Sequence, residues 1–456
     1  MSTSNSLERK PDLKVELPFG NHSPRVLILD RTAFRLGSQG STPRLVQLAY
    51  GFHAFGAAVE LVRANGDFVA EDGAAAVGAF PGDVREVPLP DLAKLPLLGP
   101  LRPLLRRVAR VLGFGPPKLG WRPARIAARV PPTGEGAQSQ APTLIWAVCK
   151  GTLENVRVAA SLARRLGVPW VVSLHDPPIE LFQAGRLRPR RRQRVVRLFR
   201  SADVVCTTNR DLRSAMIAGL GLDPVRCENV PFRLPAAPSE SIRSIASDET
   251  ATRRRLTLVY AGRLHGDAVP GQRSLVPILQ GIAALREVPG APEIVLRCAG
   301  SGDGFVEAAA AASRLGISEA FEQLGNLPSA KVAQLMQGCD ATVLVQGATQ
   351  RLQLPNKTFE LLAMPKPILA LVPHGSEVEQ VLAACGKAAI VDSESEVHDV
   401  VASLQRLVSL LQEGSQEVPS DLDTVLAAYN PETLPAQLRH IMNLAETRRR
   451  GTYGRS

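Results

Sequence analysis

The sequence predicts an α/β protein made of two Rossmann-like, doubly wound domains. Three observations lead to this prediction: short apolar runs alternate with helix-length segments, glycine-containing loops follow several of these runs, and the whole pattern restarts after residue 254. Alternation of buried strands and helices is typical of parallel sheets covered by helices. The chain has 456 residues, which is enough for two or three domains with a sizeable core.

Changes in composition along the chain suggest where its parts begin and end. A polar start contains two prolines, and a later stretch rich in Ser, Pro, Ala and charge is typical of a linker. The predicted parts are a disordered N-terminal tail at 1–24, a first Rossmann-like domain at 25–235, a linker at 236–254, a second Rossmann-like domain at 255–430, and a C-terminal helix and tail at 431–456.

The first domain opens with a strand, a glycine loop, a helix and a second strand. Residues 26–29 form a short apolar run that is typical of a buried parallel strand. A loop with Gly37 and Gly40 follows, then a helix from about Thr42 and a strand at 58–62. This order is a Rossmann-like opening, although it lacks the glycine spacing of a dinucleotide-binding fingerprint.

Later in the first domain, one strand ends in two side chains that can take part in chemistry. His175 and Asp176 end an apolar run and precede two prolines. Ligands of open α/β sheets bind at the carboxyl ends of strands, so both residues are catalytic candidates; a structural histidine remains an equal alternative. Further elements are expected as strands at 143–148, 168–174 and 202–208 and a helix at 153–166.

The second domain repeats the alternation and places Arg263, Gly300 and Gly302 at strand ends. An arginine fork suits phosphate oxygens, whereas glycine turns after strands are common and indicate little alone. Strands are expected at 256–263, 293–302, 321–325, 341–345 and 388–391, and a helix at about 431–447.

The segment from Leu354 to Leu369 predicts a helix start, one helix, a turn and a buried strand. Asn356 and Lys357 lie at the helix start, and Glu360 lies one turn later. A helix N-terminus offers unpaired N–H groups and a partial positive charge, which suit a phosphate, and Glu360 is near enough to reach a ribose. The alternative is a surface glutamate on an ordinary α/β unit.

This segment, with Lys357-x-x-Glu360-x-x-Ala363 followed by Pro367-Ile368, resembles the nucleotide-sugar site of bacterial family 4, GT-B glycosyltransferases. Residues 167–177 resemble a tract of related bacterial sequences, and the likeness covers most of residues 24–445. The resemblance implies two domains that face a cleft, with the acceptor on the first domain and the nucleotide sugar on the second. It also implies hexosyl transfer with retention and without a metal.

Roles for single residues follow from the same resemblance. In such enzymes the glutamate at the position of Glu360 binds the ribose, the arginine at Arg263 contacts the diphosphate, and the pair at His175 and Asp176 faces the donor sugar. The remaining donor-site positions are the glycine loop that approaches the diphosphate, the turn near the base, and the start of the helix: Gly37, Gly40, Gly300, Gly302, Asn356 and Lys357.

The chain departs from the family pattern at two positions. No lysine follows Arg263 within several residues; Arg273 or Lys357 could replace it. Position 352, eight residues before the glutamate, is Leu352 where many members have a carboxylate. These departures keep open a non-catalytic GT-B scaffold or binding protein, and a sugar-nucleotide 2-epimerase is the other alternative.

Composition and charge limit the partners and the compartment. The net charge of +11 suits an anionic partner, but aromatic residues make up only 4% of the chain, so nucleic acid is not expected. Six scattered cysteines without a Cys-x-x-Cys pair are expected to be reduced core residues. The histidines lack metal spacing, and we expect neither metal nor cofactor.

Two basic tracts point to a membrane surface. Residues 101–112 form an amphipathic pattern with arginines on one face, and residues 186–200 carry eight arginines and no acid. Such tracts can bind anionic lipid or a lipid-linked acceptor. The alternative for residues 101–112 is an amphipathic helix packed on the sheet, and the alternative for residues 186–200 is a solvated loop and helix face. No uninterrupted apolar run reaches the length of a membrane span, and the first twenty-odd residues contain no apolar signal-peptide core. We expect a cytoplasmic protein, peripheral at most on the inner membrane face.

Overall fold

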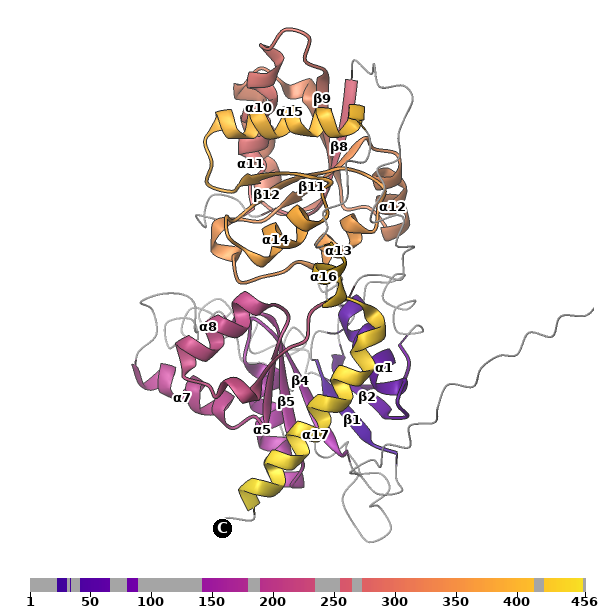
Figure 1. Ribbon diagram of the computed structural model, residues 1–456, viewed down its shortest axis with the longest axis vertical. Coiled ribbons are helices and arrows are strands. Elements are labelled where there is room, and N and C mark those ends of the chain that lie inside the picture. Colours follow the sequence, from indigo (N-terminus) through magenta and orange to yellow (C-terminus); the bar gives the residue numbers. More distant parts are fainter. Residues whose placement is uncertain are drawn as a thin grey trace, which may run out of the picture.

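The computed structural model shows two parallel sheets, one in each half of the chain, each covered by helices (Figure 1). Residues 1–22 of the predicted tail, the loop with Gly37 and Gly40, the linker and the basic segment 101–112 lie outside the residues that the structure describes. The described residues are 23–30, 33, 42–65, 80–88, 142–178, 189–233, 255–264, 273–413 and 422–453.

The first sheet has the strand order β3-β2-β1-β4-β5-β6-β7, with all described pairs parallel. The order reverses between β1 and β4, as expected of a doubly wound sheet. Its strands are β1 (Arg25–Leu29), β2 (Ala58–Asn65), β3 (Asp83–Pro88), β4 (Leu144–Lys150), β5 (Trp170–Asp176), β6 (Val204–Thr207) and β7 (Cys227–Asn229). Its helices are α1 (Thr42–His53), α5 (Glu154–Leu166), α7 (Pro189–Arg200) and α8 (Arg210–Leu220).

The second sheet has the order β10-β9-β8-β11-β12-β13, again with parallel pairs, and reverses between β8 and β11. The predicted fold class is therefore confirmed. The strands are β8 (Arg255–Arg263), β9 (Glu293–Ser301), β10 (Phe321–Gly325), β11 (Ala341–Val345), β12 (Ile368–Val372) and β13 (Ala388–Asp392). The helices are α10 (Val276–Arg286), α11 (Gly304–Arg314), α12 (Ser329–Gln337), α13 (Asn356–Leu362), α14 (Glu377–Ala384), α15 (Val397–Glu413) and α16 (Leu422–Ala427).

The last helix, α17 (Leu434–Tyr453), returns to the first domain, where it runs along the lower half of Figure 1. Leu438 and Ile441 of α17 are buried in one apolar cluster with Phe52 and Trp146. A Cβ atom at Gly51 would lie 2.7 Å from Cδ1 of Leu438, so glycine at this position lets α1 and α17 pack closely. The predicted C-terminal helix thus serves the first domain.

Buried arginines fix the places where the chain crosses between the domains. Arg44 donates hydrogen bonds to the carbonyls of Val230 and Pro231, at 2.5 and 2.7 Å. Arg233 donates to the carbonyl of Ala428 and to the side chain of Gln437. Burial and the nearby charge of Arg233 lower the pKa of Arg44 to about 9. The two crossing segments, after β7 and before α17, are therefore held together through side-chain-to-backbone bonds.

Two expectations about composition can be compared with this fold. All six cysteines are buried and unpaired, as predicted. Among the described residues, no helix is both long and apolar enough to cross a membrane.

Candidate active site

The two domains meet at the carboxyl ends of their strands. Asn209, which follows β6 in the first domain, donates to the carbonyl of Leu352, which follows β11 in the second domain, at 2.9 Å. Strands of a parallel sheet all end at the same edge, so residues after β1, β4 and β5 lie along the same first-domain edge. This edge and its counterpart on the second domain contain most of the described candidate residues.

His175 is the most buried of the predicted catalytic residues, with 5% of its surface exposed. Neither ring nitrogen has a hydrogen-bond partner among the described residues, and the ring packs edge-on against Phe232 at 6.1 Å. Burial lowers the pKa of His175 well below its usual value, and the positive charges of Arg44 and Lys150 lower it further. The imidazole is therefore neutral at physiological pH and can both donate and accept a hydrogen bond.

Asp176 ends β5 beside His175 and is influenced by cations from both domains. Burial raises the pKa of its carboxyl group, while the charges of Lys150 and Arg273 oppose that rise. Lys150 belongs to the first domain and Arg273 to the second, so each domain contributes one cation near the Asp176 carboxylate. The nearby cations favour the ionised form of this carboxylate, which can also form hydrogen bonds to a ligand in their place.

A buried ion pair next to this site was not predicted. Asp30 directly follows β1 and is fully buried, and its Oδ2 lies 2.6 Å from the Nζ of Lys150 at the end of β4. The rule that selected His175, a polar residue after an apolar strand, applies equally to Asp30 and Lys150. Both residues could have been found from the sequence on that signal.

Arg263 ends β8 on the second domain and its side chain is exposed. No hydrogen bond or ion pair of its guanidinium is found among the described residues; its carbonyl accepts from the hydroxyl of Tyr260 at 3.0 Å. The guanidinium can therefore turn toward a ligand without giving up a described protein partner.

Gly300 and Gly302 are required by the backbone itself. Both have positive φ angles, 144° and 123°. A Cβ atom at Gly300 would lie 1.8 Å from the carbonyl oxygen of Gly262, and one at Gly302 would lie 1.9 Å from that of Leu264. These glycines let the ends of β8 and β9 approach each other. The fold therefore requires glycine at both positions, whether or not the turn also lies near a nucleotide base.

The predicted donor residues of α13 are brought together. Glu360 accepts a hydrogen bond from the Nδ2 of Asn356 at 2.8 Å, and its other oxygen lies 2.6 Å from the Nζ of Lys357. The side chains of Glu360 and Lys357 are 39% and 33% exposed, whereas Phe359 and the other inward residues of α13 are buried. The helix is thus anchored by its apolar face, and its polar face can exchange internal partners for ligand hydroxyls.

Arg273 and Lys357, the two candidates for the absent lysine, lie in different surroundings. Arg273 donates from Nε to the Oε1 of Gln350 at 3.0 Å. The fully buried Gln346 holds the same loop by donating to the carbonyls of Gln350 and Gln353, at 2.6 and 2.8 Å. Arg273 is therefore held by Gln350, and its charge reaches the Asp176 carboxyl and opposes the rise in pKa that burial causes there, whereas Lys357 is paired with Glu360.

Leu352, at the position of the absent carboxylate, takes part in the domain contact. Its side chain is partly buried against the apolar core of the first domain, and its carbonyl accepts from Asn209. Gly37 and Gly40 lie outside the described residues. Within the described ranges, no three His, Cys, Asp or Glu side chains are grouped so that they could hold a metal ion.

Comparison with known proteins gives one family and a set of related structures. Residues 39–233 match the model of the glycosyl transferase 4-like domain. Sequence comparison with curated proteins gives no match.

Among solved structures, the chain is similar to an α,α-trehalose 6-phosphate synthase from Burkholderia multivorans, with a TM-score of 0.61, 14% identity, and coverage of 92% of this chain and 98% of the other. It is also similar to a glycosyltransferase from Rickettsia africae, with a TM-score of 0.57, 9% identity, and coverage of 93% and 98%. A third similar structure is the apo form of the lipopolysaccharide outer core galactosyltransferase WaaB, with a TM-score of 0.56, 12% identity, and coverage of 92% and 99%. At these identities the likeness shows a shared two-domain fold.

Proposed function

We propose that the chain is a glycosyltransferase of the GT-B fold that moves a hexosyl group from a nucleotide sugar to a glycan or lipid-linked acceptor. Residues 39–233 match the model of the glycosyl transferase 4-like domain, and solved glycosyltransferases share the two-domain fold, which supports this proposal. The observation that carries this proposal is the exposed polar face of α13, where Asn356, Lys357 and Glu360 are held together on an anchored helix. A carboxylate that exchanges its partners suits the paired hydroxyls of a ribose.

The proposed reaction breaks the bond between the anomeric carbon and a diphosphate oxygen and forms a bond to an acceptor hydroxyl, whose proton is lost. Negative charge grows on the leaving diphosphate, so cations placed there stabilise the transition state. Arg263 is exposed without a described partner, and Arg273 is held by Gln350. Two arginine forks can supply this stabilisation through their own charge, and we propose that no metal or cofactor is needed.

On the first domain, we assign His175 and Asp176 to the transferred sugar and the acceptor. A neutral imidazole whose two buried nitrogens have no hydrogen-bond partner among the described residues can hold sugar hydroxyls that reach it. We propose transfer with retention of configuration, which the family resemblance implies. The acceptor class, a surface glycan precursor or a lipid-linked one, is chosen because of the basic surface of this domain.

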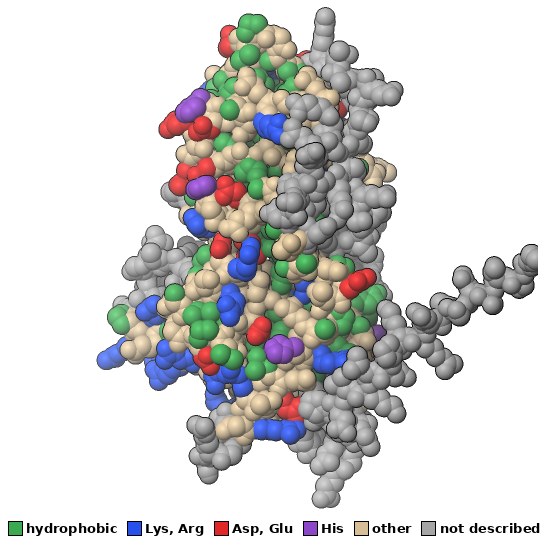
Figure 2. Space-filling model, viewed as in Figure 1, with side chains coloured by type: hydrophobic (Ala, Val, Ile, Leu, Met, Phe, Trp, Pro, Cys, Tyr) green, Lys and Arg blue, Asp and Glu red, His purple; other side chains and the backbone are tan. Residues whose placement is uncertain are grey.

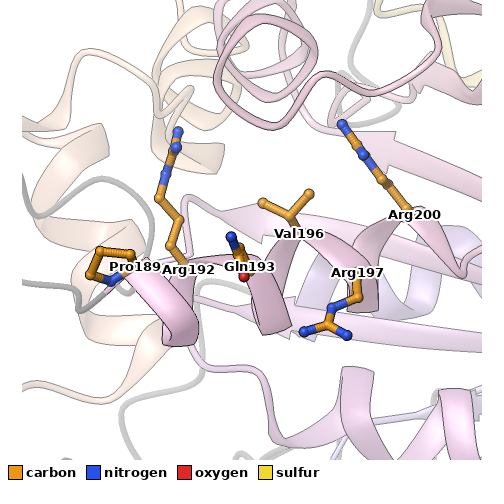
Figure 3. Close-up of a pocket in the computed structure, with 6 residues that line it drawn as sticks. All are labelled: Pro189, Arg192, Gln193, Val196, Arg197 and Arg200. Carbon is orange, nitrogen blue, oxygen red and sulfur yellow. The ribbon is translucent and has the colours of Figure 1, made fainter.

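That surface includes α7, whose arginines divide into two groups. Arg192 and Arg200 donate to the carbonyls of Gly219, Leu220 and Gly221 at the end of α8, and in Figure 3 both point to the same side of the helix while Arg197 points the other way. A pocket of about 520 Å³ lies along α7, and its lining includes Arg197 as well as Arg192 and Arg200. These two arginines are therefore used to cap α8.

The other group, Arg190, Arg194 and Arg197, is exposed and has no bond among the described residues. The positions recur at intervals of four and three residues, so they share one face of α7. Figure 2 shows basic side chains gathered over this part of the first domain. The apolar residues Val195 and Phe199 are buried in the core, so α7 offers charge to a membrane but no apolar insertion.

We propose that this basic face contacts anionic lipid at the cytoplasmic side of the membrane, where a lipid-linked acceptor would be reached. Each basic residue near an anionic surface adds roughly 1 kcal/mol, so the contact would be peripheral, reversible and weakened by salt.

The test is ligand-induced thermal stabilisation of the full chain with a panel of sugar nucleotides that vary in base and in sugar. A nucleotide sugar that binds the folded state raises the melting temperature in a concentration-dependent way. We expect one donor to do so and to yield a glycosylated product with a membrane extract. Binding with no transfer would favour the GT-B scaffold, a released free epimer would indicate a 2-epimerase, and no stabilisation by any sugar nucleotide would contradict the proposal.

A further inference from the structure

The start of α8 in the first domain faces the start of α14 in the second domain. The backbone N–H of Arg210 donates to the carboxylate of Glu377, the first residue of α14. In return, the backbone N–H of Glu377 donates to the Oδ2 of Asp211 at 3.0 Å. Each helix thus contributes a carboxylate that caps the N-terminus of the other helix, across the boundary between the domains.

The exchange of carboxylates has a clear electrostatic reason. A helix N-terminus carries unpaired N–H groups and a partial positive charge, so two N-termini brought together repel each other. Glu377 and Asp211 supply negative charge at this junction. Glu377 is only 2% exposed and also accepts from the hydroxyl of Tyr429 at 2.7 Å. Its carboxylate is satisfied only while both domains and the crossing segment at Tyr429 are in place.

Asn209 adds a bond that reaches the loop before α13. Its Oδ1 accepts from the N–H of Leu212 and so caps α8, while its Nδ2 donates to the carbonyl of Leu352. Asn209 is 1% exposed, and the side chain of Leu352 packs against the first-domain core. A carboxylate at position 352 could not make this apolar contact without losing its hydration.

We infer that these residues form an interdomain clasp that holds the two domains in their present arrangement before any ligand binds. The clasp consists of Asn209, Arg210 and Asp211 from the first domain and Leu352, Glu377 and Tyr429 from the rest of the chain. Asn209 and Leu352 are then positioning residues, because they fix the loop that leads into α13 against the domain that carries His175. This last step rests on the proposed function; the clasp itself does not.

Distance measurement between the domains tests the clasp without any ligand. Val225 in the first domain and Val306 in the second are 63% and 73% exposed, and all six native cysteines are buried. Spin labels attached after Val225→Cys and Val306→Cys should therefore report the interdomain distance by electron–electron resonance. We expect one narrow distance distribution for the ligand-free chain.

Asn209→Asp is the most selective variant, because aspartate keeps the cap of α8 but replaces the donor to Leu352 with an acceptor. We expect it to broaden the distribution, and Asp211→Ala combined with Glu377→Ala to broaden it more. The matched control is Glu379→Gln, two residues along α14, whose carboxylate bonds to Gly375 and His374 within its own domain. A broad distribution in the parent, or a narrow one in both clasp variants, would overturn the inference.

Kinetics test the positioning role separately. If Asn209→Asp leaves about one tenth of the molecules competent, the apparent donor affinity falls about tenfold while turnover at saturation changes little. Leu352→Glu, although it supplies the carboxylate that many family members have, should do the same, and Leu352→Met should not. If neither variant changes the donor KM, the positioning role is wrong even where the distance measurement supports the clasp. If no donor binds the parent, the proposed function fails and the distance measurement still decides the clasp.

Discussion

The first-domain and second-domain sides of the site are built differently. On the first domain, Asp30 and His175 are almost fully inaccessible to solvent, and burial shifts the pKa values of both His175 and Asp176. On the second domain, Arg263 is exposed and the pair of Lys357 and Glu360 is about one-third exposed. The buried side is fixed before a ligand arrives, whereas the exposed side can exchange its partners for a ligand.

This difference leads to different expectations for substitutions. A preorganised buried group affects the chemical step and the stability of the fold, because its surroundings cannot relax at low cost. An exposed group that bonds only to its neighbours chiefly affects affinity. Donor recognition should therefore depend on the second domain, and the first domain should control turnover.

Arg263→Ala should have the largest effect, and Arg263 is the expected exception to this division, because it lies on the second domain but should act on turnover. Its guanidinium is assigned to the diphosphate, where charge grows only during the reaction, so we expect kcat to fall about 100- to 1000-fold and the donor Kd to change much less. Steady-state kinetics and donor titration measure both. The control is Arg255→Ala at the other end of β8, an exposed arginine paired with Glu293. Unchanged activity of Arg263→Ala would assign this arginine to the surface.

His175→Gln should sharpen the division through the pH dependence of stability. Above a pH of about 6.5 the residue is neutral in both the folded and the unfolded chain; below it, only the unfolded chain takes up the proton. The parent should therefore lose stability as the pH falls, by up to about 1.4 kcal/mol per pH unit from this residue.

The measurement is the difference in melting temperature between parent and His175→Gln at several pH values below 7. The melting temperature of the parent should fall relative to that of His175→Gln as the pH is lowered, because the variant has no buried histidine whose protonation favours the unfolded chain. His440→Gln is the control, since His440 is 63% exposed. A gap that does not depend on pH would show that His175 titrates like an exposed histidine.

The smallest effect is expected at the basic face of α7. Arg194→Gln should weaken binding to anionic vesicles about fivefold, as removal of roughly 1 kcal/mol of attraction requires. Arg192→Gln is the matched control, since Arg192 donates to the carbonyl of Gly219 and points to the side of the helix opposite to Arg197 in Figure 3. Co-sedimentation at low and high salt measures both. Equal losses for the two variants, or none, would place the membrane contact elsewhere.

Much of this organisation could be predicted from the sequence, because parallel sheets have a simple pattern. Buried strands appear as apolar runs, and the residue after each run lies at the ligand-binding edge; this rule found His175, Asp176 and Arg263, and applied fully it would have found Asp30 and Lys150. Strand β3 was not predicted, because an edge strand with the sequence Asp-Val-Arg-Glu-Val-Pro has no apolar run.

Contacts between the domains could not be predicted in this way. Asn209 and Leu352 are 143 residues apart, and nothing local marks either one as the partner of the other. The sequence showed only that a carboxylate was absent at position 352. The structure gives a physical use for the leucine that stands there, which depends on the relative placement of two separately folded sheets.

The most direct test of the central claim is the donor affinity of Glu360→Ala beside that of His175→Gln. The donor should be the nucleotide sugar that stabilises the parent most strongly, titrated by calorimetry. Loss of the bonds between the Glu360 carboxylate and the ribose costs on the order of 1.5–3 kcal/mol, so we predict a donor Kd at least about tenfold weaker in Glu360→Ala. His175→Gln should keep the donor Kd within about threefold of the parent and lose turnover instead. An unchanged Kd in Glu360→Ala, with both proteins folded, would contradict the assignment of the donor to the second domain.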